Sequence, residues 1–422
     1  MDKEEVLDYF KEYADLNPKV ISRDLAVPID SDFIISLIGP RRAGKTYYLF
    51  QISKELDSPV YLNFEDSRLR NITYKEIRDV IRAYTELHGK EPKALLLDEV
   101  QVIEGWSIMA RELHDLKKYR IFITGSSSKM LSAEIATQLR GRTLSYLLLP
   151  FSFKEFLRIK GIDAKNATKD KEAMIKNVLS EYMEFGGFPE VVLGTEKQKI
   201  LREYSDLILF KDFIERHEIR NISLARYIHE SILQNFSKEV SSNAIFNKAK
   251  AAGISASNNT VYDYLEKLND TVMFFFLDRY SRKVHERASW PKKVYLADTG
   301  LSKAMRFSED KSKLMENIVA LELMRKRNCD PNLETYYIKN ENREVDFAIK
   351  SGTSISALIQ VAAELNDENY SREIKPLVSA SEQFGCHDLS IITWDQEGVE
   401  EYGDKRIKVV PLWKWLLSDS GM

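Results

Sequence analysis

The sequence predicts an α/β protein of several domains. At 422 residues the chain is too long for one ordinary core, so about two or three domains are expected. Short apolar segments alternate with helical patterns through the first 150 residues, which is typical of a parallel sheet with crossover helices. Later residues continue as a helical stretch and then as a mixture of helices and strands. These observations predict a sheet-based N-terminal domain followed by smaller modules.

Composition narrows the class of protein. Charged residues make up 30% of the chain but nearly cancel, with a formal net charge of −3, so any nucleic-acid surface must be a local patch. The start, MDKEEVLDYF, carries acids where a signal peptide carries positive charge, and the apolar runs are far shorter than a membrane span. Cys329 and Cys386 have no neighbouring metal-ligand partners. We expect a cytoplasmic protein without membrane contact.

The stretch IGPRRAGKTYY, residues 38–48, carries the clearest chemical signal. It matches G-x-x-x-x-G-K-[ST], a loop whose glycines let backbone N–H groups turn toward phosphate oxygens. A buried-type strand precedes it and a helical pattern follows, so a helix N-terminus would point at the phosphates. We expect Lys45 to reach the β- and γ-phosphates of ATP and Thr46 to offer its hydroxyl to Mg²⁺. The nucleotide-binding residues predicted here are Gly39, Pro40, Arg41, Arg42, Ala43, Gly44, Lys45, Thr46 and Tyr47.

Acidic residues follow later strands of the same predicted sheet. Residues 59–66, PVYLNFED, end in acids, and residues 93–101, KALLLDEVQ, deliver Asp98 and Glu99 to the end of an apolar strand. A carboxylate there can hold Mg²⁺ and a second one can orient the attacking water. We assign the metal to Asp98 and the water to Glu99. An ordinary acid pair at a strand end is the alternative.

Two further strands complete the expected sheet. Residues 119–128, YRIFITGSSS, end in Thr124, Ser126 and Ser127, of which one hydroxyl could contact the γ-phosphate or the water, although Ser and Thr are also common turn formers. Residues 144–151 would be the fifth parallel strand. Ligands of such sheets bind beyond the carboxyl ends of the strands, where all these polar groups are expected to lie.

The motifs together resemble a known family. LDEVQ at 97–101, GRT at 141–143 and GGFPEV at 186–191 recur in the archaeal-type ATPases of the AAA+ and STAND-related branch of P-loop proteins, and the resemblance runs nearly end to end. It implies that Arg140 and Arg142 approach the γ-phosphate and stabilise the transition state. It also implies that Pro189 packs on the nucleotide base. Surface arginines and a plain break between helices are the alternatives.

The resemblance and the local patterns give a domain plan. We expect an ATPase core over 1–150, a helical lid over 151–220, a winged helix over 221–290 and a nuclease-like domain over 291–422. Ser257 is predicted to cap the third helix of the winged helix. That helix offers DNA a poor outward face, with two acids and one lysine, so the wing is the better candidate for DNA contact. The wing's basic residues are Arg279, Arg282, Lys283, Arg287, Lys292 and Lys293. A purely protein-binding module remains the alternative.

The C-terminal part resembles the PD-(D/E)XK type of nuclease. Glu316 fits its helix acid and Asp346, in EVDF, its strand acid. The E-x-K position departs from the pattern, because Gln360 and Ala362 stand where an acid and a lysine are needed. Glu364 or Lys350 could in principle take their places. We expect a degenerate, inactive scaffold.

The prediction for the whole chain is a Mg²⁺-dependent ATPase whose cycle repositions the winged helix and the inactive nuclease-like domain, with DNA as the expected partner. Two alternative functions stay open: an ATP-gated DNA nuclease, and a protein-binding switch without a nucleic-acid partner. The sequence also does not decide whether the chain forms a homo-oligomer, or whether the arginines act within one chain or between chains.

Overall fold

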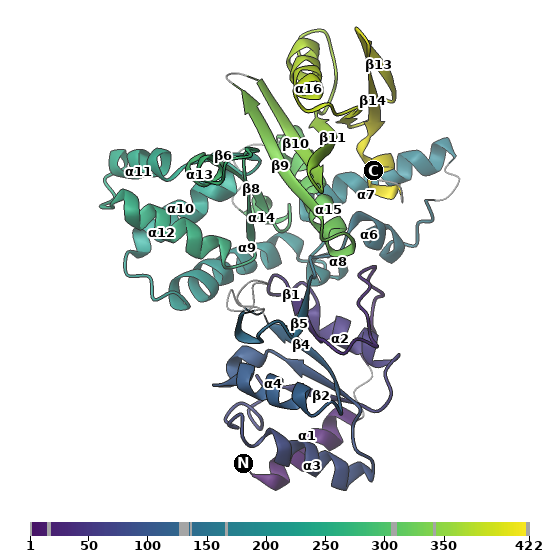
Figure 1. Cartoon of the computed structure of the whole chain (residues 1–422), viewed down its shortest axis with the longest axis vertical. Coiled ribbons are helices and arrows are strands. Elements are labelled where there is room, and N and C mark those ends of the chain that lie inside the picture. Colours follow the sequence, from purple (N-terminus) through teal and green to yellow (C-terminus); the bar gives the residue numbers. More distant parts are fainter. Residues whose placement is uncertain are drawn as a thin grey trace. The chain divides into compact units, whose positions relative to one another are not determined.

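The structure is a computed structural model, and it separates into two compact units, 1–149 and 150–422, which are described one at a time (Figure 1). The residues described are 2–14, 18–125, 135, 137–164, 168–304, 310–340 and 343–418. Within these ranges, no helix has the length and apolar character that crossing a membrane requires.

The first unit is built on a five-stranded sheet in the order β2-β3-β4-β1-β5, with every neighbouring pair parallel. The predicted five-stranded parallel sheet is therefore confirmed. Parallel strands require crossover connections, and the segments between strands supply them. The strands are β1 (Ile34–Ile38), β2 (Pro59–Asn63), β3 (Ala94–Asp98), β4 (Arg120–Gly125) and β5 (Thr143–Leu147).

Helices cover both faces of this sheet. Strand side chains alternate in direction, so Ile35 and Leu37 pack with Leu49 of α2, while Ile34 and Ile38 join a larger cluster with residues of the other helices. Burial on both faces explains why these strands are continuous apolar runs. The helices are α1 (Lys3–Ala14), α2 (Lys45–Ser53), α3 (Ile77–His88) and α4 (Trp106–Asp115), with a short 3₁₀ turn over Val100–Val102.

The second unit begins with helices, as the sequence predicts for residues 151–220. Ser152 caps the first of them by accepting a hydrogen bond from the Glu155 N–H at 3.2 Å, and the Glu155 carboxylate accepts from the Ser152 N–H at 2.7 Å. The helices are α6 (Phe153–Ile159), α7 (Lys169–Phe185), α8 (Pro189–Leu193) and α9 (Lys197–Leu207), which continues as a π-helix over Ile208–Glu215.

A module of helices and a small antiparallel sheet follows (Figure 1). Ser257 caps α12 by accepting a hydrogen bond from the Thr260 N–H at 3.0 Å, which confirms the predicted cap. The sheet order is β6-β8-β7, and β8 lies beyond the boundary predicted at residue 290. That boundary therefore divides strands that pair with one another. The elements are α10 (Ile222–Gln234), β6 (Lys238–Val240), α11 (Ser242–Ala251), α12 (Asn258–Asn269), β7 (Phe274–Leu277), α13 (Val284–Ser289) and β8 (Lys292–Leu296).

The rest of the second unit holds a six-stranded mixed sheet in the order β13-β14-β12-β11-β10-β9. Its strands are β9 (Leu333–Asn340), β10 (Arg343–Ser351), β11 (Ser354–Val361), β12 (Asp388–Thr393), β13 (Gly398–Tyr402) and β14 (Lys405–Pro411). Its helices are α14 (Leu301–Ala304), α15 (Lys311–Cys329), α16 (Tyr370–Phe384) and α17 (Leu412–Leu417).

Candidate active site on the parallel sheet

The loop between β1 and α2 has the backbone of a phosphate-binding turn. Gly44 has φ 94° and Arg42 has φ 68°, so the chain passes through left-handed conformations as it reverses direction. A Cβ on Gly39 would lie 2.1 Å from the Leu148 carbonyl oxygen of the neighbouring segment, so this position also requires glycine. The loop ends in the first turn of α2, whose N–H groups carry the positive end of the helix dipole.

Lys45, at the start of α2, is buried against this loop. Its ammonium donates to the carbonyl oxygens of Gly39 and Pro40, both at 3.0 Å. The side chain is thus held at the mouth of the turn, where a phosphate would bring negative charge. Tyr47, two residues further along α2, is about half exposed.

Asp98, the last residue of β3, receives hydroxyl donors from neighbouring elements. The hydroxyls of Thr46 and Tyr61 donate to its Oδ2 at 2.7 Å each, and the Thr124 hydroxyl donates to its Oδ1. The carboxyl is 2% exposed. Burial, and next the charge of Glu99, raise the pKa of Asp98 above its ordinary value, and the hydroxyl donors oppose that shift. A buried carboxylate held by neutral donors keeps its charge available for a cation.

Thr124 links Asp98 to Glu99. While its hydroxyl donates to Asp98, its oxygen accepts a hydrogen bond from the Glu99 N–H at 3.0 Å. Glu99 has φ 52°, a left-handed conformation that costs a non-glycine residue of order 1 kcal/mol or more, and its carboxylate accepts a hydrogen bond from Gln101. Thr124 therefore positions both acids, and its expected contact with the γ-phosphate or the water stays a prediction. Ser126 and Ser127 lie outside the described residues.

Two residues of this site escaped the sequence reasoning. Tyr61 lies on β2, the strand beside β3. Because side chains alternate between the faces of a sheet, its position could have indicated the contact with Asp98 once the strand order was known. Arg23 is buried and its guanidinium donates to the Ala43 carbonyl oxygen at 3.0 Å, so it braces the phosphate loop. Nothing in the sequence distinguishes this arginine from an exposed one, because its contact depends on the tertiary fold.

Arg140 and Arg142 lie away from this edge. The Ile34 N–H donates to the Arg142 carbonyl oxygen at 2.8 Å, which places Arg142 beside the first residue of β1. The phosphate loop follows the last residue of β1, roughly 13 Å away at about 3.3 Å per residue. The Arg142 guanidinium pairs with Asp115 at 3.0 Å. Arg142 therefore lies at the opposite end of β1 from the phosphate loop of its own chain, and the contact of Arg140 or Arg142 with a γ-phosphate, within or between chains, stays a prediction.

Pro189 and its preceding glycines lie in the second unit. Pro189 is the first residue of α8, and the Gly187 N–H donates to Asp298 at 2.7 Å. A Cβ on Gly186 would lie 1.6 Å from an Asp298 oxygen, and one on Gly187 would lie 2.2 Å from the Phe151 carbonyl oxygen. The glycines are thus required by contacts within this unit. The contact of Pro189 with a nucleotide base stays a prediction.

Most basic residues of the predicted wing have partners within the second unit. Lys292 pairs with Asp278 at 3.0 Å, Lys283 with Glu286 at 3.0 Å, and Arg287 donates to the Ser281 carbonyl oxygen at 2.7 Å. Arg279 stacks on Trp290 and donates to the Lys339 carbonyl oxygen. Lys293 is 2% exposed, so its expected place on a DNA-contacting surface is wrong. Arg282 is exposed.

On the outward face of α12, Lys267 pairs with Asp263 at 2.8 Å. The one lysine of that face is therefore balanced by an acid on the preceding turn, and this face carries little positive charge toward solvent.

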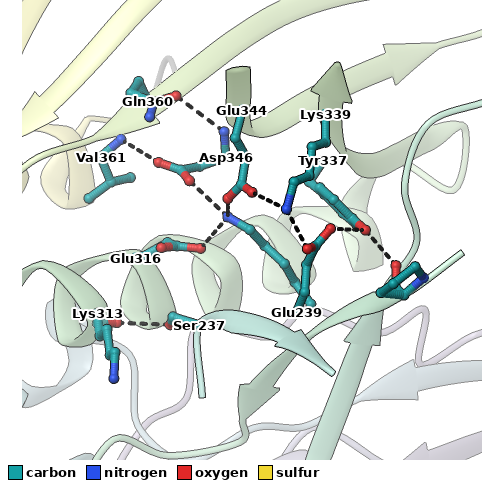
Figure 2. Close-up of polar contacts among 12 residues, drawn as sticks. Ser237, Glu239, Lys313, Glu316, Tyr337, Lys339, Glu344, Asp346, Gln360 and Val361 are labelled. Atoms are coloured by element: carbon teal, nitrogen blue, oxygen red, sulfur yellow. Dashed lines mark hydrogen bonds and ion pairs between the residues drawn. The ribbon is translucent and has the colours of Figure 1, made fainter. Parts of the chain in front are cut away.

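The acid pair of the predicted nuclease-like domain does come together (Figure 2). Lys293 bridges Glu316 of α15 and Asp346 of β10, at 2.9 and 2.8 Å. Gln360 accepts from the Asp346 N–H at 3.3 Å and donates to Glu373 at 2.8 Å. The substitutes considered from sequence lie elsewhere, because Lys350 pairs with Glu334 at 3.0 Å and the Glu364 side chain is exposed.

The oxygen atoms of Thr46 and Asp98 fit Mg²⁺ better than the second acid site does. Mg²⁺ prefers oxygen ligands and usually keeps several waters beside one or two protein groups. The Thr46 hydroxyl and Asp98 Oδ2 lie 2.7 Å apart, at the end of the phosphate loop. At Glu316 and Asp346 an ammonium already occupies the space between the carboxylates.

Two family models match parts of this chain. An AAA domain matches residues 31–157, and a domain of unknown function (DUF8612) matches residues 176–312. Among solved structures, the chain is similar to the Walker-type ATPase PABY2304 of Pyrococcus abyssi, with 16% identity, 72% of this chain and 96% of that chain covered, and a TM-score of 0.43. It is also similar to the Aeropyrum pernix ORC1 protein in complex with DNA, with 13% identity, 75% and 93% covered, and a TM-score of 0.29.

Curated relatives extend over most of the chain. "Uncharacterized protein MJ1544" of Methanocaldococcus jannaschii is 40% identical over 413 residues, which cover 95% of this chain and 92% of that protein. An "Uncharacterized protein" of Haemophilus influenzae is 29% identical over 357 residues, covering 81% of this chain and 85% of that protein. With an AAA domain on its parallel sheet, this protein is a P-loop ATPase, and its chain belongs to the same family as MJ1544.

Proposed function

We propose that the protein hydrolyses ATP in a Mg²⁺-dependent reaction at the edge formed by the phosphate loop, Asp98 and Glu99. The observation that carries this proposal is the set of hydroxyls from Thr46, Tyr61 and Thr124 that converge on the buried Asp98 carboxylate. They hold the carboxylate beside the phosphate loop without neutralising it, as a divalent-cation site requires.

Each residue has a distinct role in this proposal. Loop N–H groups and the Lys45 ammonium bind the phosphates and stabilise the charge that develops in transfer. Thr46 and Asp98 would hold Mg²⁺, which would supply positive charge to stabilise the phosphates. Glu99 orients the attacking water and accepts its proton, while Thr124 and Tyr61 act as positioning residues through hydrogen bonds to the acids.

Release of phosphate from ATP tests this proposal directly. The purified chain should turn over ATP with Mg²⁺ and stop when the metal is chelated. Asp98→Asn should lower the rate at every Mg²⁺ concentration, because the amide is a weaker cation ligand. Turnover that persists unchanged in the presence of a chelator, or in Asp98→Asn, would contradict the metal site proposed.

We further propose that hydrolysis controls how the second unit engages a partner, with DNA as the first candidate through the module of α10 to β8. Support comes from the exposed Arg282 and from the resemblance to a winged helix. A protein partner is the second candidate, and the internal pairing of Lys283, Lys292 and Lys267 favours it, since paired lysines bind phosphate backbones weakly.

ATPase rate and retention of duplex DNA, each measured at low and physiological salt, separate these candidates. A DNA-associated ATPase should be stimulated by duplex or single-stranded DNA and should lose DNA as salt rises. Arg282→Ala should reduce that retention, with Lys267→Ala on α12 as the matched control. Turnover indifferent to DNA, together with no salt-sensitive retention, would favour the protein partner.

We propose that the nuclease-like domain is inactive. Gln360 is a neutral ligand engaged with Glu373, and Ala362 cannot supply a charge. The rival proposal, an ATP-gated nuclease, predicts cleavage of plasmid with Mg²⁺ or Mn²⁺. We expect no nicked or linear product with or without ATP. Cleavage by the wild type that disappears in Asp346→Ala would establish the rival.

We propose a role for Arg140 and Arg142 at a nucleotide only between copies of the chain, since both lie away from the phosphate edge of their own sheet. In that case ATPase activity per chain should rise with protein concentration. Mixing Arg142→Ala with Lys45→Ala should restore part of the activity, because each variant supplies what the other lacks. Activity that is flat with concentration and unrescued by mixing would remove the arginines from the mechanism.

A further inference from the structure

A lysine ammonium lies at the centre of the acid cluster in the second unit. Lys293 Nζ contacts Glu316 at 2.9 Å, Asp346 at 2.8 Å and Glu344 at 2.7 Å (Figure 2). These acids come from different elements, since Glu316 lies on α15 and the other two lie on β10. The lysine comes from β8, which pairs with β6 and β7.

The cluster is closed around this ammonium. The Lys293 side chain is 2% exposed, and those of Asp346 and Glu316 are 8% and 12% exposed. The Asp346 oxygen that does not face the lysine has its own donor, because the Val361 N–H donates to Asp346 Oδ2 at 2.9 Å. Only Glu344, at 33% exposed, opens one side of the cluster toward solvent.

The carboxylates determine the charge state of the lysine. Burial by itself would lower the pKa of Lys293, but the charges of Asp346 and Glu316 outweigh it and hold that pKa well above its ordinary value. An ammonium in contact with three carboxylates is a cationic part of the cluster, and removing it would leave buried carboxylates without compensation.

The three carboxylates carry the oxygen atoms that divalent cations prefer, although no group of three or more such side chains in the described part of the chain forms a ready metal site. Carboxylate oxygens from a helix and a strand converge on one point, and oxygen ligands of this kind hold Mg²⁺, Mn²⁺ or Ca²⁺ at roughly 2.0 to 2.6 Å. The Lys293 ammonium lies at that point, and its distances to the carboxylate oxygens are slightly longer than metal–oxygen distances. Its N–H groups donate to the same oxygens that would bind the metal. Metal ion and ammonium cannot occupy it together.

We propose that the Lys293 ammonium is a built-in replacement for a divalent metal ion at Glu316, Glu344 and Asp346, so that the cluster binds no metal until the ammonium is removed. This inference deepens the proposed inactivity of the nuclease-like domain and rests on it. The lysine also ties β8 to α15 and β10, so the replacement cation holds the small antiparallel sheet to the six-stranded sheet.

Binding of Mn²⁺ to the full-length, nucleotide-free protein tests the proposal, with bound metal counted by electron paramagnetic resonance. The variants are Lys293→Met, which removes the charge, and Lys293→Met with Glu344→Gln, which keeps the formal charge of the cluster. Each variant is compared with a second protein that carries the same substitutions plus Asp346→Asn. The difference in bound Mn²⁺ between the two excludes metal bound at the phosphate loop. We expect the lysine variants to bind about one additional Mn²⁺ ion per chain. Adding Asp346→Asn should lower the affinity for that ion by at least about tenfold.

The wild type should bind the same amount of Mn²⁺ with and without Asp346→Asn. Wild-type binding that depends on Asp346 would overturn the proposal without any lysine substitution. Folded lysine variants that gain no Mn²⁺ would overturn it too. If Lys293→Met is unfolded without metal, a rise in its melting temperature on adding Mn²⁺ supports the proposal. If Mn²⁺ does not raise the melting temperature of the charge-matched variant, the proposal is contradicted. DNA cleavage is assayed separately from metal binding. If the wild type does not cleave DNA and the lysine variants bind no Mn²⁺, the proposed inactivity stands and only the metal-replacement proposal fails.

Discussion

Asp98 in the first unit and Asp346 in the second are both buried acids on strands, with 2% and 6% of the whole residue exposed, yet their partners differ in kind. Asp98 accepts hydrogen bonds from neutral hydroxyls, whereas Asp346 contacts the Lys293 ammonium. Hydroxyls orient a carboxylate and leave its charge, while an ammonium cancels it. The comparison teaches that the partners of a buried acid, more than its burial, decide whether it can serve a metal.

The largest effect is expected at the phosphate loop, beside the acid that keeps its charge. Lys45→Ala should abolish hydrolysis and weaken ATP binding, because the γ-phosphate loses the ammonium held over Gly39 and Pro40. The loss of transition-state stabilisation should be on the order of 3 to 4 kcal/mol. Phosphate release and nucleotide binding measure it, and a rate near that of the wild type would contradict the site. Lys350→Ala in the second unit is the matched control.

Glu99→Gln should separate binding from turnover. The amide keeps the shape of the carboxylate and its contact with Gln101, but it cannot accept a proton from water. Turnover should fall by about 10² to 10⁴, while ATP stays bound. Loss of ATP binding as severe as in Lys45→Ala would instead make Glu99 a structural residue or a metal ligand.

A smaller effect is expected from the hydroxyls that orient the acids. Thr124→Val keeps the volume of the side chain but leaves the Glu99 N–H and one Asp98 oxygen without this partner. The cost should be about 1 to 3 kcal/mol, shared between stability and kcat. Thr124→Ser, which restores the hydroxyl, should recover most of it. Equal activity of the valine and serine variants would show that the hydroxyl positions nothing.

Asp298 is a third buried acid, and its partners differ from those of Asp98 and Asp346. Its oxygens accept hydrogen bonds from the backbone N–H groups of Gly187 and Gly300 at 2.7 and 2.8 Å. Burial raises its pKa from 3.8 to about 7, despite these donors. The folded protein thus holds a proton that the unfolded chain has released, so this contribution to stability is complete below about pH 4 and is lost as the pH rises through about 7.

Asp298→Asn should remove that part of the pH dependence. The difference in unfolding free energy between wild type and variant should change by up to about 1.4 kcal/mol per pH unit between these limits. Denaturant unfolding at pH 5, 6, 7 and 8 measures it. Parallel pH profiles for the two proteins would show that Asp298 does not titrate in this range.

The phosphate site was predictable because its signal is local. The loop from Gly39 to Thr46 must carry glycines and a lysine at fixed spacing, and the acids must end an apolar strand, so a short stretch specifies each part. The strand order then brings Asp98 to the loop. Tyr61 and Arg23 were missed because their contacts arise only when β2 and the segment before β1 pack against the sheet.

Lys293 and Arg142 show what local sequence patterns could not predict. Lys293 belongs to a basic run that resembles an exposed wing, and only the pairing of β8 with β6 and β7 turns it inward to Glu316 and Asp346. Arg142 fits its motif by spacing, but its place at the start of β5 puts it at the opposite end of the strands from the phosphate loop. Both placements depend on long-range contacts, which local patterns do not encode.

The most direct test of the contrast between the acids is ATP turnover as a function of Mg²⁺ concentration in Asp98→Asn and Asp346→Asn, measured side by side with the wild type. The account predicts that Asp98→Asn loses Mg²⁺-dependent turnover by about 10² or more, because its carboxylate serves the metal, while Asp346→Asn follows the wild-type curve. A wild-type curve for Asp98→Asn, or an equal loss in both variants, would contradict it.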